Sequence, residues 1–181
     1  MRAIVQGIRG NRGCGVKRNI TGAMLLFLAT VSLSNAADKP VWIDNAANIS
    51  IPSIPAEGIA HGKKFKVEKA TIQNGILELR QGQGFFPDYS FMIFTFLEKD
   101  EIASGKILTV RPSDGLGGPH IHFKYKVSGK DMPETEMFME KFTMRLEFIE
   151  TAGNQVTGKI YLCLPDENKS FVAGIFKADR K

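Results

Sequence analysis

The strongest constraint on the fold is a run of seven uncharged residues, Phe91–Leu97, made almost entirely of aromatic and aliphatic side chains. The run is too short to span a bilayer as a helix, and it shows no polar alternation. Such a run is typical of a strand in the middle of a sheet that is covered on both faces. The sequence therefore predicts a buried central strand with shorter, half-buried strands around it.

The first 36 residues have the pattern of a secretory signal peptide. A leader without acidic residues precedes an apolar run over residues 20–33, and Ser34-Asn35-Ala36 then offers small residues to a signal peptidase. The basic residues of the leader are Arg2, Arg9, Arg12, Lys17 and Arg18. The sequence predicts an exported protein, periplasmic or secreted, with no transmembrane segment after the signal is removed.

The charge of the chain depends on this leader. The whole chain has 24 basic and 19 acidic residues, and five of the basic ones lie in the leader, which leaves 19 of each sign. A protein that binds nucleic acid needs a surplus of Lys and Arg, so we exclude that class of partner. Cys14 belongs to the leader, so Cys163 has no partner for an internal disulfide and is predicted to be a small buried side chain.

Residues 37–60 are predicted to form an extended, Pro-rich arm, because Ile51-Pro52 and Ile54-Pro55 favour extended backbone before each proline. Trp42, the only tryptophan, is a candidate to dock the arm. Two interpretations stay open: the arm packs on the domain, or it binds a partner. Residues 61–181 are predicted to form a single β domain.

The pattern within residues 61–181 is that of an all-β protein. In His120–Val127, apolar Ile121 and Phe123 alternate with histidine and lysine, as in a strand with one face on the core. Asn74-Gly75 suits a tight hairpin turn, and Gly174 marks a bulge or a close backbone approach. The predicted strands are residues 65–72, 76–80, 91–97, 106–111, 120–127, 142–148, 156–164 and 170–178.

About eight such strands favour an antiparallel two-sheet sandwich, with a closed β-barrel as the alternative. A short helix near residues 133–141 is also compatible with the sequence. Because a sandwich buries one face of each sheet, something must cover the second apolar face of the central strand. We expect the methionine-rich segment around Met137 to do so.

A metal site is one functional hypothesis. His120 and His122 are two residues apart on a predicted strand, so their side chains project from one face about 7 Å apart. His61 is the third histidine of the chain and a candidate third ligand for copper or zinc. Methionine thioethers favour monovalent copper, although they also serve as packing. The methionines considered are Met132, Met137, Met139 and Met144.

A ligand-binding loop is the other hypothesis. The candidate residues combine aromatic rings with a carboxylate, a combination that suits binding of a sugar or a peptide. The same residues are equally compatible with packing at the end of the core. They are Phe85, Phe86, Asp88 and Tyr89. No Gly-x-Ser-x-Gly signature of a hydrolase is present, so no catalytic residue is identified.

The C-terminal segments Gly158–Asp166 and Ser170–Ala178 resemble the closing hairpin of small exported bacterial β-sandwich-like domains of unknown function. The resemblance implies a β-sandwich-like fold and a bacterial envelope setting. Together these features predict an exported, non-enzymatic domain that binds a protein or carbohydrate ligand. The alternatives are a metal-binding protein that uses His120 and His122, and a hydrolase whose site is unrecognised. The sequence does not specify an oligomeric state.

Overall fold

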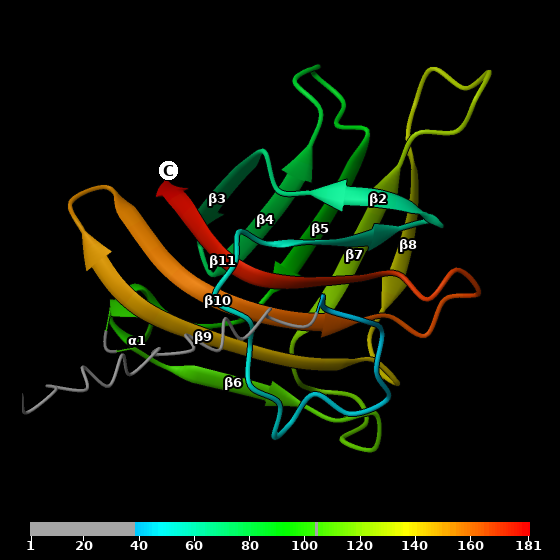
Figure 1. Ribbon diagram of the computed structural model, residues 1–181. Helices are drawn as coiled ribbons and strands as arrows, with labels where there is room; N and C mark the ends of the chain where they lie inside the picture. The colour runs from blue at the N-terminus through cyan, green and yellow to red at the C-terminus, as the bar shows by residue number, and fades with distance from the viewer. Residues whose placement is uncertain (1–38, 104) are drawn as a thin grey trace, which may run out of the picture. The chain divides into compact units, whose positions relative to one another are not determined.

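The structure is a computed structural model that describes residues 39–103 and 105–181, so the predicted signal peptide lies outside the described residues. The all-β prediction is confirmed, because the described residues form eleven strands and one short helix, α1 (Lys99–Ala103) (Figure 1). The strands are β1 (Glu57–Ala60), β2 (Lys63–Lys66), β3 (Lys69–Gln73), β4 (Ile76–Gln81), β5 (Tyr89–Phe94), β6 (Ile107–Val110), β7 (His120–Tyr125), β8 (Glu134–Phe138), β9 (Thr143–Ala152), β10 (Gln155–Cys163) and β11 (Phe171–Arg180). Within the described residues, no helix has the length and apolarity needed to cross a bilayer.

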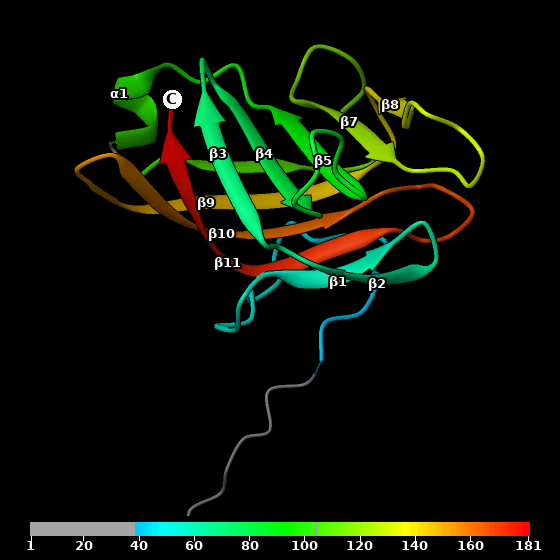
Figure 2. The ribbon, with the colours of Figure 1, turned by 90° about the horizontal axis from the view of Figure 1, so that it is seen from above.

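All of these strands are hydrogen-bonded into one sheet. Its order is β6-β9-β10-β11-β3-β4-β5-β7-β8, and β1 pairs with both β11 and β2. The pairing is antiparallel except between β11 and β3, which are parallel. The sheet curls into a half-barrel, so that the long strands β9 to β11 run across β3, β4 and β5 (Figures 1 and 2).

The main core fills the inside of this curl. Phe91 and Ile93 of β5 and Phe123 of β7 are fully buried there, and they belong to the same cluster as Leu146 and Ile160 from β9 and β10. The inward alternation predicted for β7 is confirmed, and the strand predicted over residues 142–148 likewise buries Phe142, Met144, Leu146 and Phe148. The Asn74-Gly75 turn is also present, since Gln73 pairs with Ile76 and both turn residues have positive φ.

The arm packs on the outer face of β10 and β11 and forms a second core. Trp42 donates its indole N–H to the Leu164 carbonyl at 2.8 Å, and Tyr161 donates its hydroxyl to the Val41 carbonyl at 2.5 Å. The buried residues of this second core are Ala46, Ile51, Tyr161, Cys163, Phe171 and Ala173. Burial raises the pKa of the Cys163 thiol to about 12, as expected for a small structural side chain.

The same arm explains two local features. Thr143 lies on the outer side of the sheet yet is only 2% exposed, because the arm covers it and the Ala46 amide donates a 2.7 Å hydrogen bond to its hydroxyl. At Gly174 (φ +133°), a Cβ atom would lie 2.6 Å from the Ile54 carbonyl oxygen, so the chain makes the predicted close backbone approach. The sheet begins at Glu57, four residues before the predicted start of the domain.

The short helix suggested near residues 133–141 is a wrong prediction. Residues 134–138 form β8, which pairs antiparallel with β7 from Ile121↔Phe138 to Tyr125↔Glu134. The open edge of β7 provides hydrogen-bond partners for an extended chain, and this tertiary pairing outweighs the local helical tendency. The helix of the structure is α1, between β5 and β6.

Docking of the arm gives a test of the second core. We expect Trp42→Ala to lower the free energy of unfolding by about 2 kcal/mol, because the half-buried indole loses both its packing and its hydrogen bond. Urea denaturation measures this change. Val41→Ala is the matched control, since that side chain is 60% exposed and should change stability by less than about 0.5 kcal/mol. Equal stability of the two variants would contradict a docked arm.

Candidate binding face

The central strand is not covered on both faces, and this corrects the first expectation from the sequence. One side of β5 is buried in the core, but Met92 and Phe94 on the other side are only half-buried, and Phe96 just beyond the strand is 64% exposed. The methionine-rich segment lies beside β7 as strand β8, and Met137 is 67% exposed. The segment therefore extends the outer face of the sheet and leaves it open.

Strand register gathers a chemically unusual set of side chains on this open face. Met92 pairs with His122, and His122 pairs with Met137, so the imidazole lies in one row between two thioethers. Directly paired residues on neighbouring strands have Cβ atoms about 4.5–5.5 Å apart. We call these residues, together with their ring neighbours, the His–Met face. Its members are Met92, Phe94, Phe96, His120, His122 and Met137.

The aromatic rings of this face contact one another. Phe94 stacks on His120 with ring centroids 4.4 Å apart, and it lies 4.5 Å from the His122 ring. The two imidazole rings are 5.3 Å apart, and Phe96 lies 5.2 Å from His120. The predicted grouping of His120 and His122 on one face is therefore present, with a wall of phenylalanine rings beside it.

Phe96 is held on the surface by a strained backbone. Its φ is +57°, in the left-handed region that bulky residues rarely adopt. The turn is fixed by Thr95, whose hydroxyl donates to the Gly75 carbonyl at 2.7 Å and accepts from the Leu97 amide at 3.2 Å. Strain of this kind persists where surrounding contacts enforce it, and it is common at binding sites. Here it presents an exposed ring next to His120.

The electrostatics of the face favour a neutral imidazole. Burial lowers the pKa of His122, and the nearby charges of His120 and Lys124 lower it further. A neutral imidazole keeps one ring nitrogen with a lone pair that can accept a hydrogen bond or bind a metal ion.

His61 does not join the other two histidines. Its ring stacks on Tyr125 at 4.1 Å and contacts the Asn168 side chain through Nδ1 at 3.2 Å. Tyr125 points to the inner face of β7, opposite to His122. No group of three His, Cys, Asp or Glu side chains converges anywhere in residues 39–103 and 105–181. Within the described residues, His61 therefore does not complete a set of three or four ligands of the kind that binds zinc.

The aromatic loop contributes only in part to a surface site. Phe85 is 90% exposed and contacts Phe86 edge-to-face at 4.8 Å. Both rings line a cavity of about 310 Å³. Asp88 instead forms a 2.7 Å ion pair with Lys126, and Tyr89 packs against the core. The other residues that line the cavity include Arg80, Lys124 and Met132.

The sequence places Met92, Phe94 and Phe96 on the second apolar face of the central strand, but it does not identify them as site residues. A run without alternation does not show which of its two faces is buried, so the sequence does not show that this face stays open. Their role appears only when β5 is paired with β7, which puts Phe94 opposite His120 and Met92 opposite His122.

No protein-family model, curated protein or solved structure matches this chain. A function therefore has to be inferred from the geometry of its surface.

The electrostatic setting of His122 gives a second test. We expect the pKa of His122, followed by NMR of the ring protons, to lie below the ordinary value of 6.5. Lys124→Gln removes one of the positive charges that lower this pKa and should raise it. Lys177→Gln, an exposed change on the distant strand β11, should leave it where it was. A His122 pKa that is insensitive to Lys124→Gln would contradict this description of the face.

Proposed function

We propose that this protein is a non-enzymatic, exported binding protein whose His–Met face binds monovalent copper. The observation that carries the proposal is the row Met92–His122–Met137, in which two thioethers lie on either side of one imidazole across three neighbouring strands. Thioether and imidazole ligands are the soft and borderline donors that Cu(I) prefers. His120, 5.3 Å from His122 between ring centroids, is available as a further ligand.

The charge of the surroundings supports a monovalent ion over a divalent one. Lys124 follows His122 on the same face of β7 and repels any cation. That repulsion is half as large for Cu(I) as for Zn²⁺ at the same distance. On the other side of the row, Glu78 pairs with Met92 and brings one carboxylate to the edge of the face. Neutral ligands with one nearby carboxylate suit a single positive charge.

The leader pattern supports export, and it agrees with the bacterial envelope setting that the C-terminal resemblance implies. For the fold, we infer that the two halves of the curled sheet act as the two layers of a sandwich. Supporting this, β6 and β8 end the strand order and do not pair with each other, as the closure of a barrel would require. The open face of β5, β7 and β8 is then the outer side of one layer.

Copper binding is tested on the full chain carrying Cys14→Ser, so that the leader thiol does not compete for the ion. Competition with a Cu(I) chelator under reducing conditions should give one ion per chain. The double variant Met92→Leu, Met137→Leu should bind Cu(I) at least about tenfold more weakly. Replacing a residue that only orients a metal ligand already lowers metal affinity about 10- to 100-fold, so removing two ligands should lower it at least as much. The swap keeps side-chain volume, so the fold should be retained.

Met132→Leu is the matched control, because Met132 is exposed but lies in the cavity of the aromatic loop rather than in the row. It should bind Cu(I) like the parent chain, and His61→Ala should do the same because His61 lies on the inner side of β7. Stoichiometric zinc binding, or Cu(I) affinity unchanged in the double Met→Leu variant, would contradict the proposal.

A second candidate function is binding of a protein or carbohydrate ligand at the aromatic loop. It is favoured by the 90% exposure of Phe85 and by its position on a cavity of about 310 Å³ beside Arg80 and Lys124. An exposed ring next to cationic donors suits a sugar ring or an acidic peptide.

Glycan and peptide arrays probed with the full chain test this candidate. A positive probe should lose about 1 kcal/mol of binding free energy in Phe85→Ala, since the ring supplies stacking area. Leu116→Ala, another exposed apolar side chain on a loop, should bind like the parent chain. Equal binding by the two variants would exclude the aromatic loop as the contact surface.

A further inference from the structure

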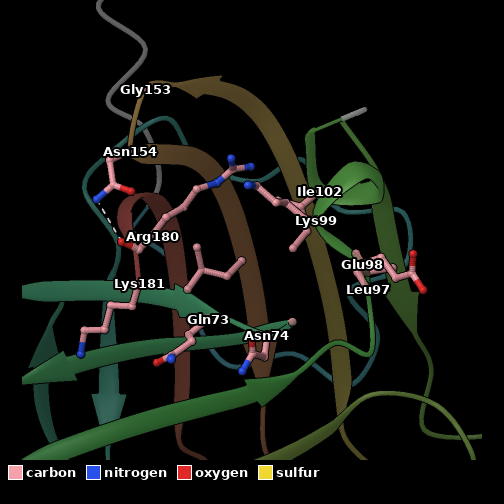
Figure 3. Close-up of a pocket in the computed structure, with 12 residues that line it drawn as sticks. Gln73, Asn74, Leu97, Glu98, Lys99, Ile102, Gly153, Asn154, Arg180 and Lys181 are labelled. Atoms are coloured by element: carbon pink, nitrogen blue, oxygen red, sulfur yellow. Dashed lines mark hydrogen bonds between the residues drawn. The ribbon is translucent and has the colours of Figure 1, made fainter.

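A separate cavity of about 580 Å³ lies at the end of the half-barrel that carries α1 (Figure 3). Its walls come from four parts of the chain: the β3–β4 turn, the segment from β5 into α1, the β9–β10 turn and the end of β11. None of the residues of the His–Met face lines it. The cavity is therefore a second site, distinct from the proposed copper site.

Arg180 lines this cavity, and part of its guanidinium group has no hydrogen-bond partner in the part of the chain that the structure describes. One terminal guanidinium nitrogen, Nη2, is buried and has no hydrogen-bond partner among the described residues. The backbone at Arg180 is fixed, because its amide donates to the Asn154 carbonyl at 2.8 Å and its carbonyl accepts from the Asn154 side chain at 3.0 Å. A buried donor without a partner costs free energy, and more when the group is charged. Rotation of the Arg180 side chain toward a ligand in the cavity would give Nη2 an acceptor and remove that cost.

The charge around Arg180 favours an anion. In Figure 3 the side chain of Lys99 extends from α1 toward the Arg180 guanidinium, while the carboxylate of Glu98 turns away from it. Among the described residues, neither Arg180 nor Lys99 forms a side-chain ion pair. Two cationic groups without a protein counter-ion make one side of the cavity electropositive.

One part of the cavity wall is apolar, and the remaining wall carries polar side chains such as Gln73 and Asn154. Ile72, Leu97 and Ile102 line the apolar part, and all three belong to the main core cluster, so an apolar ligand would extend that core. An electropositive end beside an apolar wall matches a molecule with an anionic head and an aliphatic body. The volume lies within the range of about 300–1,000 Å³ found for small-molecule sites.

We propose that this cavity binds an aliphatic carboxylate of medium chain length, with the carboxylate accepting hydrogen bonds from Arg180. A carboxylate can accept two parallel hydrogen bonds from a guanidinium, which is a strong and directional pairing. Lys99 adds charge at the rim, and Ile72, Leu97 and Ile102 contact the aliphatic chain. An inorganic anion would use Arg180 alone, and an uncharged amphiphile would use the apolar wall alone.

Isothermal titration of the full chain with octanoate tests the site. We expect octanoate to bind, and acetate, inorganic phosphate and octyl glucoside to bind at least about tenfold more weakly, since each lacks one of the two required features. Arg180→Gln should weaken octanoate binding at least about tenfold, in line with loss of a charged hydrogen bond. Lys99→Gln should weaken it about threefold, because an exposed charge contributes less.

Arg111→Gln is the matched control, since this exposed arginine lies outside the cavity and should leave octanoate binding unchanged. Lys99→Gln tests the same site in a variant that should fold normally, because Lys99 is on the surface and its replacement does not disturb the core. Retained octanoate binding in Arg180→Gln, or phosphate or octyl glucoside binding as tight as octanoate, would overturn the proposal. Unchanged binding in His122→Ala is expected, because the two sites share no residue.

Discussion

The structure depends on a sheet that curls far enough to bury its inner face against itself. Phe91, Ile93 and Phe123 on one half of the sheet form a single apolar cluster with Leu146 and Ile160 on the other, and no helix is needed to cover them. Since one curled sheet encloses the main core, its outer face is left to be covered separately. How each half of that face is covered decides where the protein can bind something.

The two halves differ in this respect. The arm covers the outer face of β10 and β11, where Trp42 and Ile51 build a second core over Tyr161 and Cys163. The outer face of β5, β7 and β8 has no such cover, and beside Lys124 and Thr135 it carries a group of histidine, methionine and phenylalanine side chains. An uncovered apolar surface costs free energy in water, and it is on this surface that the proposed copper site lies.

Local patterns were sufficient for much of the fold. The alternation from His120 to Tyr125 correctly assigned the inner face of β7, and Asn74-Gly75 correctly located a hairpin turn. Two expectations failed for the same reason. The helix near residues 133–141 and the covering of β5 by the methionines both depended on where residues 134–138 would pair, and local sequence does not encode a long-range partner.

The sequence by itself determined the all-β class, the inner side chains of β7 and β9, and the presence of two histidines on one face, because strand periodicity is a local property of the backbone. Only the tertiary structure decided that Met92 and Met137 lie on either side of His122, since cross-strand neighbours depend on register. It likewise decided that Arg180 and Lys99, which are far apart in the sequence, meet at one cavity. Both proposed sites are products of strand pairing and sheet curl, which bring together residues that no local pattern connects.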